Sequence, residues 1–266
     1  MIQLVTAENE AQFLALANQP SVTACKIHTL YQCYRDDPTM AQFWIFSRGE
    51  RPMGILSLCS KVLTIWAPYL LAPEFAEFLN FIGWELVECD STGIFSVANL
   101  LGAPVENCSV QRFDRLPQES LQRREIPAIQ DELSIRELYE LLCQTDEKFK
   151  DVSVLDAWMC SISHRVRHGF SKVYGILEGE ALVSTAGIYT ESASCGVIES
   201  VATHPQYRGR GYASALVLQC VQTLASAGKS ALLVTSQLRT HEMYHRLGFR
   251  DSGTLFFMRP FDEAKR

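Results

Sequence analysis

A turn rich in glycine and arginine, His204–Gly211, lies between a strand pattern and a long helical pattern, and it constrains the fold more than any other feature. The apolar pattern before it predicts a strand over residues 195–203. The helix is predicted from Tyr212 to Ala227, where Gly228 ends it. A strand that leads through a short loop into a helix is typical of α/β proteins, so the turn predicts an α/β fold.

The residue types in this turn also predict its chemistry. A helix N-terminus leaves backbone N–H groups without intrahelical partners and carries partial positive charge, so it binds phosphate groups. Gly209 and Gly211 remove side chains that would block a close approach to these donors, and Arg208 and Arg210 add positive charge. Ala213 keeps the first helical turn narrow. We therefore expect the turn to hold a pyrophosphate on main-chain amides.

The turn fits neither of two common phosphate-binding motifs. No Gly-Lys-Ser/Thr follows, as in a Walker loop, and the spacing is not the Gly-x-Gly-x-x-Gly of dinucleotide-binding proteins. Arg208-Gly209-Arg210-Gly211-Tyr212-Ala213 resembles instead the acetyl-CoA signature (Gln/Arg)-x-x-Gly-x-(Gly/Ala) of the GNAT superfamily of N-acetyltransferases. Val201-Ala202-Thr203-His204-Pro205 resembles the family's fourth strand and its exit, and Tyr244-His245-Arg246-Leu247-Gly248-Phe249 resembles its Tyr-x-x-Leu-Gly-Phe. The resemblance covers residues 131–266.

The resemblance implies a mixed, mostly antiparallel central sheet flanked by helices, and an enzyme that uses acetyl-CoA as co-substrate and needs no metal. The acetyl group would pass directly from the thioester to a primary amine. The pantetheine arm would pair with the backbone of the fourth strand at Val201, Ala202 and Thr203. The diphosphate would bind to the turn and the start of the helix, that is, to Arg208, Gly209, Arg210, Gly211, Tyr212 and Ala213.

Two residues are candidates for proton transfer in such a reaction. Tyr244 matches the family's tyrosine and would be the acid that protonates the leaving thiolate. Glu199 is the only carboxylate on the predicted fourth strand and would be the base. Side chains alternate between the two faces of a regular strand, so Glu199, Val201 and Thr203 are predicted to lie on the same face. The alternative is that Glu199 is an exposed strand residue or a salt-bridge partner. Gln237 stands where the family often has an asparagine.

The N-terminal half repeats the same order of elements more weakly. Residues 43–46 form a strand pattern, and Arg48-Gly49-Glu50 resembles the later hairpin turn Glu178-Gly179-Glu180. A helix over 75–82 ends at a glycine, as the later one does, but nothing corresponds to the glycine and arginine turn. We expect two tandem GNAT-like domains, with residues 1–118 degenerate or accessory and residues 119–266 binding acetyl-CoA. A chance match of two α/β segments remains the alternative. A linker is predicted over 116–131, and a last strand over 254–259.

A competing motif occurs in the C-terminal part. His241-Glu242-Met243-Tyr244-His245 is a His-Glu-x-x-His sequence, which on a helix places two imidazoles on one face, as in zinc proteases. Asp251 is spaced as a third ligand. Against a zinc hydrolase, few residues follow Asp251, and Tyr244 and Gly248 already belong to the other motif. His164 and His168 have the same spacing, with no third ligand expected nearby.

Composition excludes several classes of protein. With 266 residues, 47% hydrophobic and 20% charged, the chain can bury a sizeable core. A net charge of −6 argues against non-specific nucleic-acid binding. The start lacks the pattern of a signal peptide, no apolar stretch is long enough to cross a membrane, and nine cysteines without paired spacing suggest reduced thiols. We therefore expect a cytoplasmic protein.

Other points stay open at this stage. A non-catalytic acyl-CoA-binding module is the main alternative to an enzyme, with Glu199 and Tyr244 then structural. The amine acceptor would be chosen near residues 147–152, where Lys148, Lys150 and Asp151 lie. A homodimer is neither favoured nor excluded by the sequence.

Overall fold

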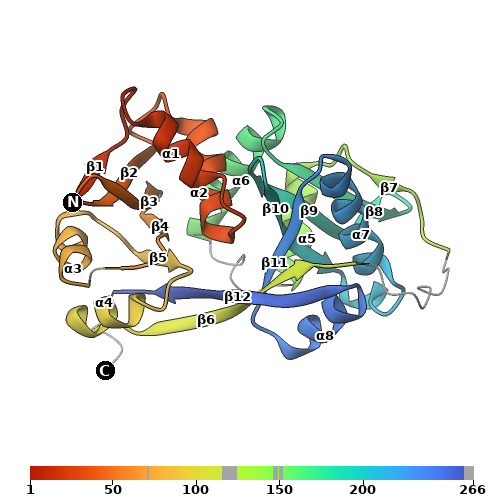
Figure 1. Ribbon diagram of the computed structural model, residues 1–266. Coiled ribbons are helices and arrows are strands. Elements are labelled where there is room, and N and C mark those ends of the chain that lie inside the picture. Colours follow the sequence, from red (N-terminus) through yellow and green to blue (C-terminus); the bar gives the residue numbers. More distant parts are fainter. Residues whose placement is uncertain (71, 116–124, 146–148, 150–151, 261–266) are drawn as a thin grey trace.

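The computed structural model describes the whole chain except residues 71, 116–124, 146–148, 150–151 and 261–266 (Figure 1). Two successive sets of elements follow the same order. The first set contains β1 (Ile2–Leu4), α1 (Glu10–Ala17), α2 (Val22–Tyr34), β2 (Ala41–Arg48), β3 (Arg51–Cys59), β4 (Val62–Trp66), α3 (Ala72–Phe81), β5 (Leu86–Cys89), α4 (Ile94–Leu101) and β6 (Val105–Phe113).

The second set repeats this order of strands and helices. It contains β7 (Ile129–Gln130), α5 (Ile135–Thr145), α6 (Val152–Arg167), β8 (Lys172–Glu178), β9 (Ala181–Glu191), β10 (Cys195–Thr203), α7 (Tyr212–Ser226), β11 (Ser230–Thr235), α8 (Leu238–Arg246) and β12 (Phe249–Met258). A short 3-10 turn, Pro205–Tyr207, precedes α7. The prediction of two tandem copies is therefore confirmed. The predicted boundary between residues 118 and 119 lies outside the described residues and stays a prediction.

The described strands form one twelve-stranded sheet in the order β1-β2-β3-β4-β5-β12-β6-β11-β10-β9-β8-β7. Neighbours are antiparallel except β4 with β5 and β10 with β11, which are parallel. The sheet is thus mixed and mostly antiparallel, as predicted.

The two halves exchange their last strands at the centre of the sheet. β12, from the second half, pairs with β5 of the first, and β6, from the first half, pairs with β11 of the second. β6 and β12 also pair with each other, and together they form the long ribbon that crosses the lower part of Figure 1. The predicted strand over 254–259 begins earlier, at Phe249, because β6 supplies a partner along that whole length.

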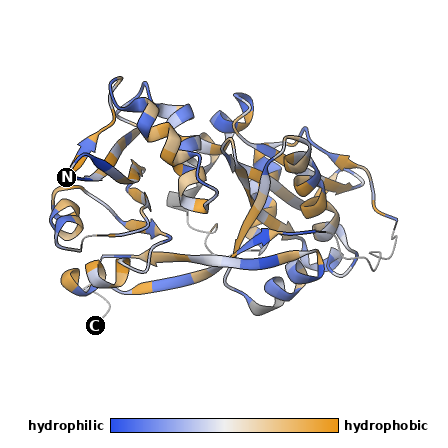
Figure 2. Cartoon of the chain, viewed as in Figure 1, coloured by the Kyte–Doolittle hydropathy of each residue, from blue (hydrophilic) through white to orange (hydrophobic). Residues whose placement is uncertain are grey.

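Each half covers both faces of its part of the sheet with helices. In the second half, α7 packs on one face in an apolar cluster with Ile188, Ile198 and Leu216. Helices α5 and α6 pack on the other face, in a cluster with Val173 and Tyr189. The strand exchange reaches into these cores, because Phe256 and Met258 of β12 are buried in the cluster of the first half. Hydrophilic residues predominate in α8, which lies at the outer side of β12 (Figure 2).

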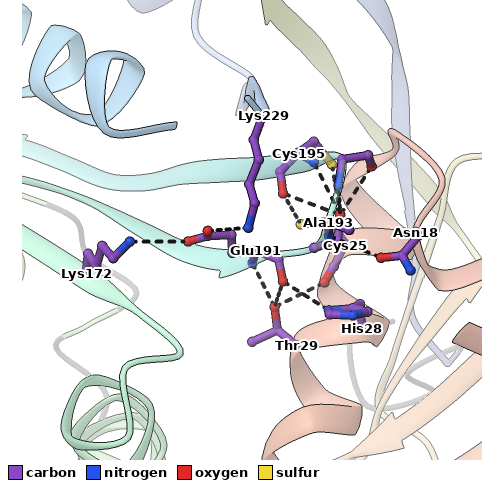
Figure 3. Close-up of polar contacts among 11 residues, drawn as sticks. Asn18, Cys25, His28, Thr29, Lys172, Glu191, Ala193, Cys195 and Lys229 are labelled. Atoms are coloured by element: carbon purple, nitrogen blue, oxygen red, sulfur yellow. Dashed lines mark hydrogen bonds and ion pairs between the residues drawn. The ribbon is translucent and has the colours of Figure 1, made fainter. Parts of the chain in front are cut away.

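The halves also meet where α2 contacts the ends of β9 and β10 (Figure 3). The Thr29 hydroxyl donates to the carbonyl oxygen of Glu191 at 3.0 Å and accepts from its backbone N–H at 2.8 Å. The Cys25 thiol donates to the carbonyl oxygen of Cys195 at 3.4 Å. The Glu191 carboxylate forms an ion pair with Lys229 at 2.5 Å. The first half therefore holds the strand that leads to the predicted site.

Candidate functional site

Strands β10 and β11 separate halfway along their length. They pair in parallel from Cys195 with Ser230 to Ile198 with Leu233. Beyond that point, β10 continues along β9, whereas β11 continues along β6 through Val234 and Thr235. No ladder between β10 and β11 is described past Ile198, so the facing backbone groups of the two strands border a gap in the sheet. Val201, Ala202 and Thr203, the residues expected to bind the pantetheine arm, lie on β10 in this part.

A β-bulge in β10 changes which residues share a face. Ser200 has a φ of 52°, and the register with β9 shifts between Glu199, opposite Gly187, and Ala202, opposite Thr185. Because paired residues point to the same face, the register places Glu199 with Ala202 and not with Thr203. The predicted shared face of Glu199, Val201 and Thr203 is therefore wrong, since it assumed a regular strand.

The turn after β10 is fixed by its own side chains. The His204 ring nitrogen Nδ1 accepts from the backbone N–H of Gln206 at 3.3 Å and caps the 3-10 turn. Arg208 donates from Nε to the carbonyl oxygen of Thr203 at 3.1 Å. Gly209 and Gly211 have φ values of 80° and 91°, which favour glycine. The predicted turn therefore depends on glycine for its backbone conformation as well as for access.

Helix α7 begins in the manner expected of an anion site. Its N-cap is Gly211, so no side chain occupies the N–H groups of the first turn. A Cβ placed on Gly209 would meet no atom within 4 Å, so the space outside the turn is open. The side chains of Arg208 and Arg210 are exposed beside it. These features fit a pyrophosphate group bound by the turn.

Tyr212 and Arg210 have contacts that sequence reasoning did not anticipate. The Tyr212 hydroxyl donates to Oε1 of Glu178, at the end of β8, and this hydrogen bond raises the pKa of Tyr212. Arg210 lies 3.5 Å from the same carboxylate oxygen and 4.8 Å from the ring centre of Tyr207. The Tyr212 side chain thus packs inward, and only its backbone is left to contribute to an anion site.

The two candidate catalytic residues lie on opposite faces of the sheet. Glu199 is exposed and, by register, lies on the face of Tyr189, which α5 and α6 cover. Its charge contributes, after burial, to raising the pKa of the Tyr189 hydroxyl. Tyr244 is buried on the α7 face, in the cluster that contains Ile198 and Leu233, the last paired residues before the gap. Burial raises the pKa of Tyr244 to about 12, so this hydroxyl stays protonated at neutral pH.

Two features near the site could not be predicted from the local sequence. Ser200 adopts a left-handed conformation that serine rarely takes. Tyr189 contributes from β9 a buried hydroxyl on the face of Glu199. Of the loop expected to choose the acceptor, Lys148, Lys150 and Asp151 lie outside the described residues. Gln237 is the N-cap residue of α8, and its side chain makes no capping hydrogen bond.

Comparisons with known proteins give a family match for the second half of the chain. Residues 134–249 match the model of the acetyltransferase (GNAT) family. This match and the fold support a protein class that transfers acyl groups from acyl-CoA. No curated protein sequence matches the chain.

Solved structures of similar fold extend over both halves. A tandem GNAT protein from the clavulanic acid biosynthesis pathway is 12% identical with a TM-score of 0.63, and 97% of each chain is covered. A protein from Drosophila melanogaster is 15% identical with a TM-score of 0.66, and 98% of each chain is covered. A GNAT-family acetyltransferase from Colwellia psychrerythraea is 10% identical with a TM-score of 0.57. The match covers 98% of the present chain and 100% of the Colwellia chain. At these identities the likeness shows the fold alone.

Among the described residues, no helix is both long and apolar enough to cross a membrane. All nine cysteines are free thiols, and several are buried, Cys25, Cys89, Cys195 and Cys220 among them.

Proposed function

We propose that this protein is an N-acetyltransferase that moves the acetyl group of acetyl-CoA directly to a primary amine. One observation carries the proposal: the gap between β10 and β11 opens beside the glycine turn that starts α7. A thin pantetheine arm needs unpaired strand backbone, and a diphosphate needs unpaired N–H groups. The chain supplies both next to each other, within the part that matches the model of an acetyltransferase family.

In this proposal the backbone of β10 and the turn bind the co-substrate. The main chain of Val201, Ala202 and Thr203 pairs with the amide groups of the arm. The diphosphate binds the turn and the start of α7, Arg208–Ala213, chiefly through N–H groups of the first helical turn, and the exposed guanidinium groups of Arg208 and Arg210 add positive charge. Bound acetyl-CoA supplies an activated thioester, while the protein orients it against the acceptor.

Glu199 and Tyr244 move the protons. Glu199 takes the proton from the ammonium group of the acceptor, directly or through water, so that the amine becomes a nucleophile. Its exposed position gives it access to an incoming substrate. Tyr244 keeps its proton because burial raises its pKa to about 12. It donates that proton to the leaving thiolate and is reprotonated by the second proton that the acceptor nitrogen loses after its attack on the thioester. The two residues act from opposite faces of the gap, one on the acceptor and one on the sulfur.

A non-catalytic acyl-CoA-binding module is the second candidate. The observation in its favour is the burial of Tyr244, which is 6% exposed and packs on Phe249 with ring centres 5.9 Å apart. Packing alone would account for such a residue. With a cognate amine in hand, Glu199→Gln combined with Tyr244→Phe separates the two candidate functions. Unchanged turnover would rule out proton transfer by either residue.

The first experiment is a calorimetric titration of acetyl-CoA into metal-stripped protein. We expect wild type to bind with micromolar affinity and Gly211→Glu to bind at least about 100-fold more weakly, because glutamate adds bulk and negative charge where the diphosphate binds. Gly49→Glu is a matched control, since Gly49 also has a positive φ, 61°, with open space around it, in a hairpin of the first half. Equal binding by all three proteins would contradict the proposal.

If the titration succeeds, an amine screen identifies the acceptor. Small polyamines, amino sugars and peptide N-termini cover the main classes of primary amine. We place the protein in the cytoplasm on the strength of its free thiols, a placement that fractionation of cells would test.

A further inference from the structure

The face of α8 that carries two histidines meets an aspartate of β12. His241 and His245 are one helical turn apart, with ring centres 4.4 Å from each other. Nε2 of His241 lies 2.8 Å from Oδ1 of Asp251, and Nε2 of His245 lies 3.6 Å from Oδ2 of the same carboxylate. One ligand atom from each of the three residues lies within 4.8 Å of the other two. Two imidazole nitrogens and a carboxylate oxygen thus converge on one point.

Strand β6 holds the aspartate in place. Asp251 is paired with Gln111, and the bulge that follows at the next residue of β12 keeps Ser109 within reach on the same side. The Ser109 hydroxyl donates to Oδ1 of Asp251 at 2.9 Å, and the Gln111 amide donates to it at 3.3 Å. Gln111 is fully buried, and its Oε1 has no hydrogen-bond partner among the described residues. A buried amide directed at a carboxylate is the kind of support that orients a metal ligand.

One imidazole nitrogen of the group has no hydrogen-bond partner within the described ranges. Nε2 of His245 is buried and has no hydrogen-bond partner in the part of the chain that is described. A metal ion would bind this nitrogen directly, whereas Oδ2 of Asp251, at 3.6 Å, lies beyond hydrogen-bond distance.

We propose that His241, His245 and Asp251 bind one divalent transition-metal ion of the zinc type. Two imidazoles and a carboxylate are ligands that zinc accepts, and a water molecule would complete four-coordination because the group is partly exposed. Calcium and magnesium, which prefer oxygen ligands, are not expected to bind. None of the three side chains takes part in the proposed acetyl transfer, so the site is additional to it.

The location gives the ion a structural role. Two ligands come from α8 and one from β12, and the supporting Ser109 and Gln111 come from β6 of the first half. A bound ion would therefore fasten α8 to the exchanged strands at the centre of the sheet. Because the ion binds the folded chain only, its presence raises the thermal midpoint of unfolding.

The spacing of the histidines does not by itself make such a site. His164 and His168 on α6 are also one turn apart, with ring centres at 4.5 Å. Yet the group of His241, His245 and Asp251 is the one cluster of three possible metal ligands found among the described residues. His168 is exposed and thus supplies a matched control.

The test is a titration of chelator-treated full-length protein with ZnCl₂ alone, followed by competition with a chromogenic chelator. We expect one equivalent of Zn²⁺ to bind wild type and His168→Ala equally. His241→Ala, His245→Ala and Asp251→Asn should each weaken binding at least about tenfold, and Ser109→Ala should weaken it by about tenfold. MgCl₂ should not compete. Binding of Zn²⁺ by His241→Ala and His245→Ala with wild-type affinity would overturn the proposal, as would no binding by wild type.

A second measurement needs no variant and so does not depend on how the variants fold. The chain has six histidines, and their imidazole signals can be followed by NMR during the same titration. We expect one equivalent of Zn²⁺ to shift two histidine signals strongly and to raise the thermal midpoint of unfolding. Shifts spread over the other four histidines, or none at all, would show that the cluster is not the site.

Discussion

Arg208 donates from Nε to the carbonyl oxygen of Thr203 at 3.1 Å, so an arginine within the glycine turn is bonded to the last residue of β10. This contact closes the turn at its base, where the strand ends. The backbone that would bind the pantetheine arm and the backbone that would bind the diphosphate are thereby held in a fixed relation. Such pre-organisation reduces the entropy lost on binding.

Replacing Arg208 tests whether its bond to Thr203 holds the strand and the turn in position for acetyl-CoA. Arg208→Ala removes both the bond to Thr203 and one positive charge, and we expect the affinity for acetyl-CoA to fall about tenfold, since charge-assisted hydrogen bonds are worth about 1.5–3 kcal/mol and this one is exposed. Calorimetry against wild type measures the change. Arg136→Ala is the control, because Arg136 is an exposed arginine of α5 that pairs only with Glu140 in the described contacts. An equal loss in both variants would show that the effect is one of general charge.

Glu199→Gln tests the proposed base. General base catalysis contributes about 10²–10⁴ in rate, so kcat/KM should fall by a factor in that range while acetyl-CoA binding is unchanged. The rate of the variant should recover as the pH rises toward the pKa of the amine, because the free amine then needs no base. The control is Glu180→Gln, an exposed residue of the β8–β9 hairpin. A pH profile identical to that of wild type would remove Glu199 from the mechanism.

Tyr244→Phe tests the proposed acid and predicts a pH dependence. Burial raises the pKa of Tyr244 to about 12, so the hydroxyl keeps its proton at every pH up to about 11. Wild-type kcat should therefore show no alkaline decline from this group below that pH. In Tyr244→Phe, kcat should fall about 10- to 100-fold, with thermal stability measured in parallel. If kcat is unaffected and only the thermal midpoint drops, the tyrosine serves packing alone.

The glycine turn could be predicted because its information is local. Residue types within a short window predict a turn at Gly209 and Gly211 and a helix that starts at Tyr212. The structure has the turn and the helix start at these residues. The bulge at Ser200 could not be predicted, because serine carries no preference for a left-handed backbone. Its consequence is large: the face of every later residue of β10 is inverted, so the parity argument for Glu199 was wrong although the strand itself was correct.

The strand exchange was beyond sequence reasoning for a different reason. The pattern of β12 shows that it is a strand but not which strand lies beside it. Its partners β5 and β6 belong to the other half of the chain, and they determine its length and the burial of Phe256 and Met258. Likewise, the His-Glu-x-x-His motif placed two imidazoles on one face, but the contribution of Ser109 and Gln111 depends on pairing between distant segments.

The reactivity of Cys195 tests how firmly the two halves are packed together, because its lowered pKa favours reaction and its burial prevents it. A hydrogen bond from Cys25 lowers the pKa of Cys195, which alone would make it reactive, but both residues are fully buried between α2 and β10. Cys160, by contrast, is exposed on α6. We expect a maleimide at pH 7 to label Cys160 first and to leave Cys25 and Cys195 unlabelled until denaturant is added, as mapped by mass spectrometry. Labelling of Cys195 as fast as Cys160 would mean that α2 separates readily from the second half.

The exchanged strands predict that the second half does not fold without the first. Residues 125–266 contain the glycine turn and both proposed catalytic residues, yet they lack β6, which fills the place between β11 and β12. Without it, β12 loses the partner it has from Phe249 to Met258, and the edge of β11 is uncovered. Phe256 and Met258 also lose the cluster of the first half that buries them. Exposed apolar strand edges favour aggregation.

We therefore expect residues 125–266, produced alone, to give poorly dispersed NMR signals and no measurable acetyl-CoA binding. Co-expression with residues 1–115, which end after β6, should restore both, because the missing strand is then supplied in trans. The uncut chain is the reference for affinity and for the thermal midpoint. A well-folded fragment that binds acetyl-CoA as tightly as the full chain would show that the first half is dispensable for the site. In that case α2 and β6 would have to serve a purpose other than holding β10 and β11 in place.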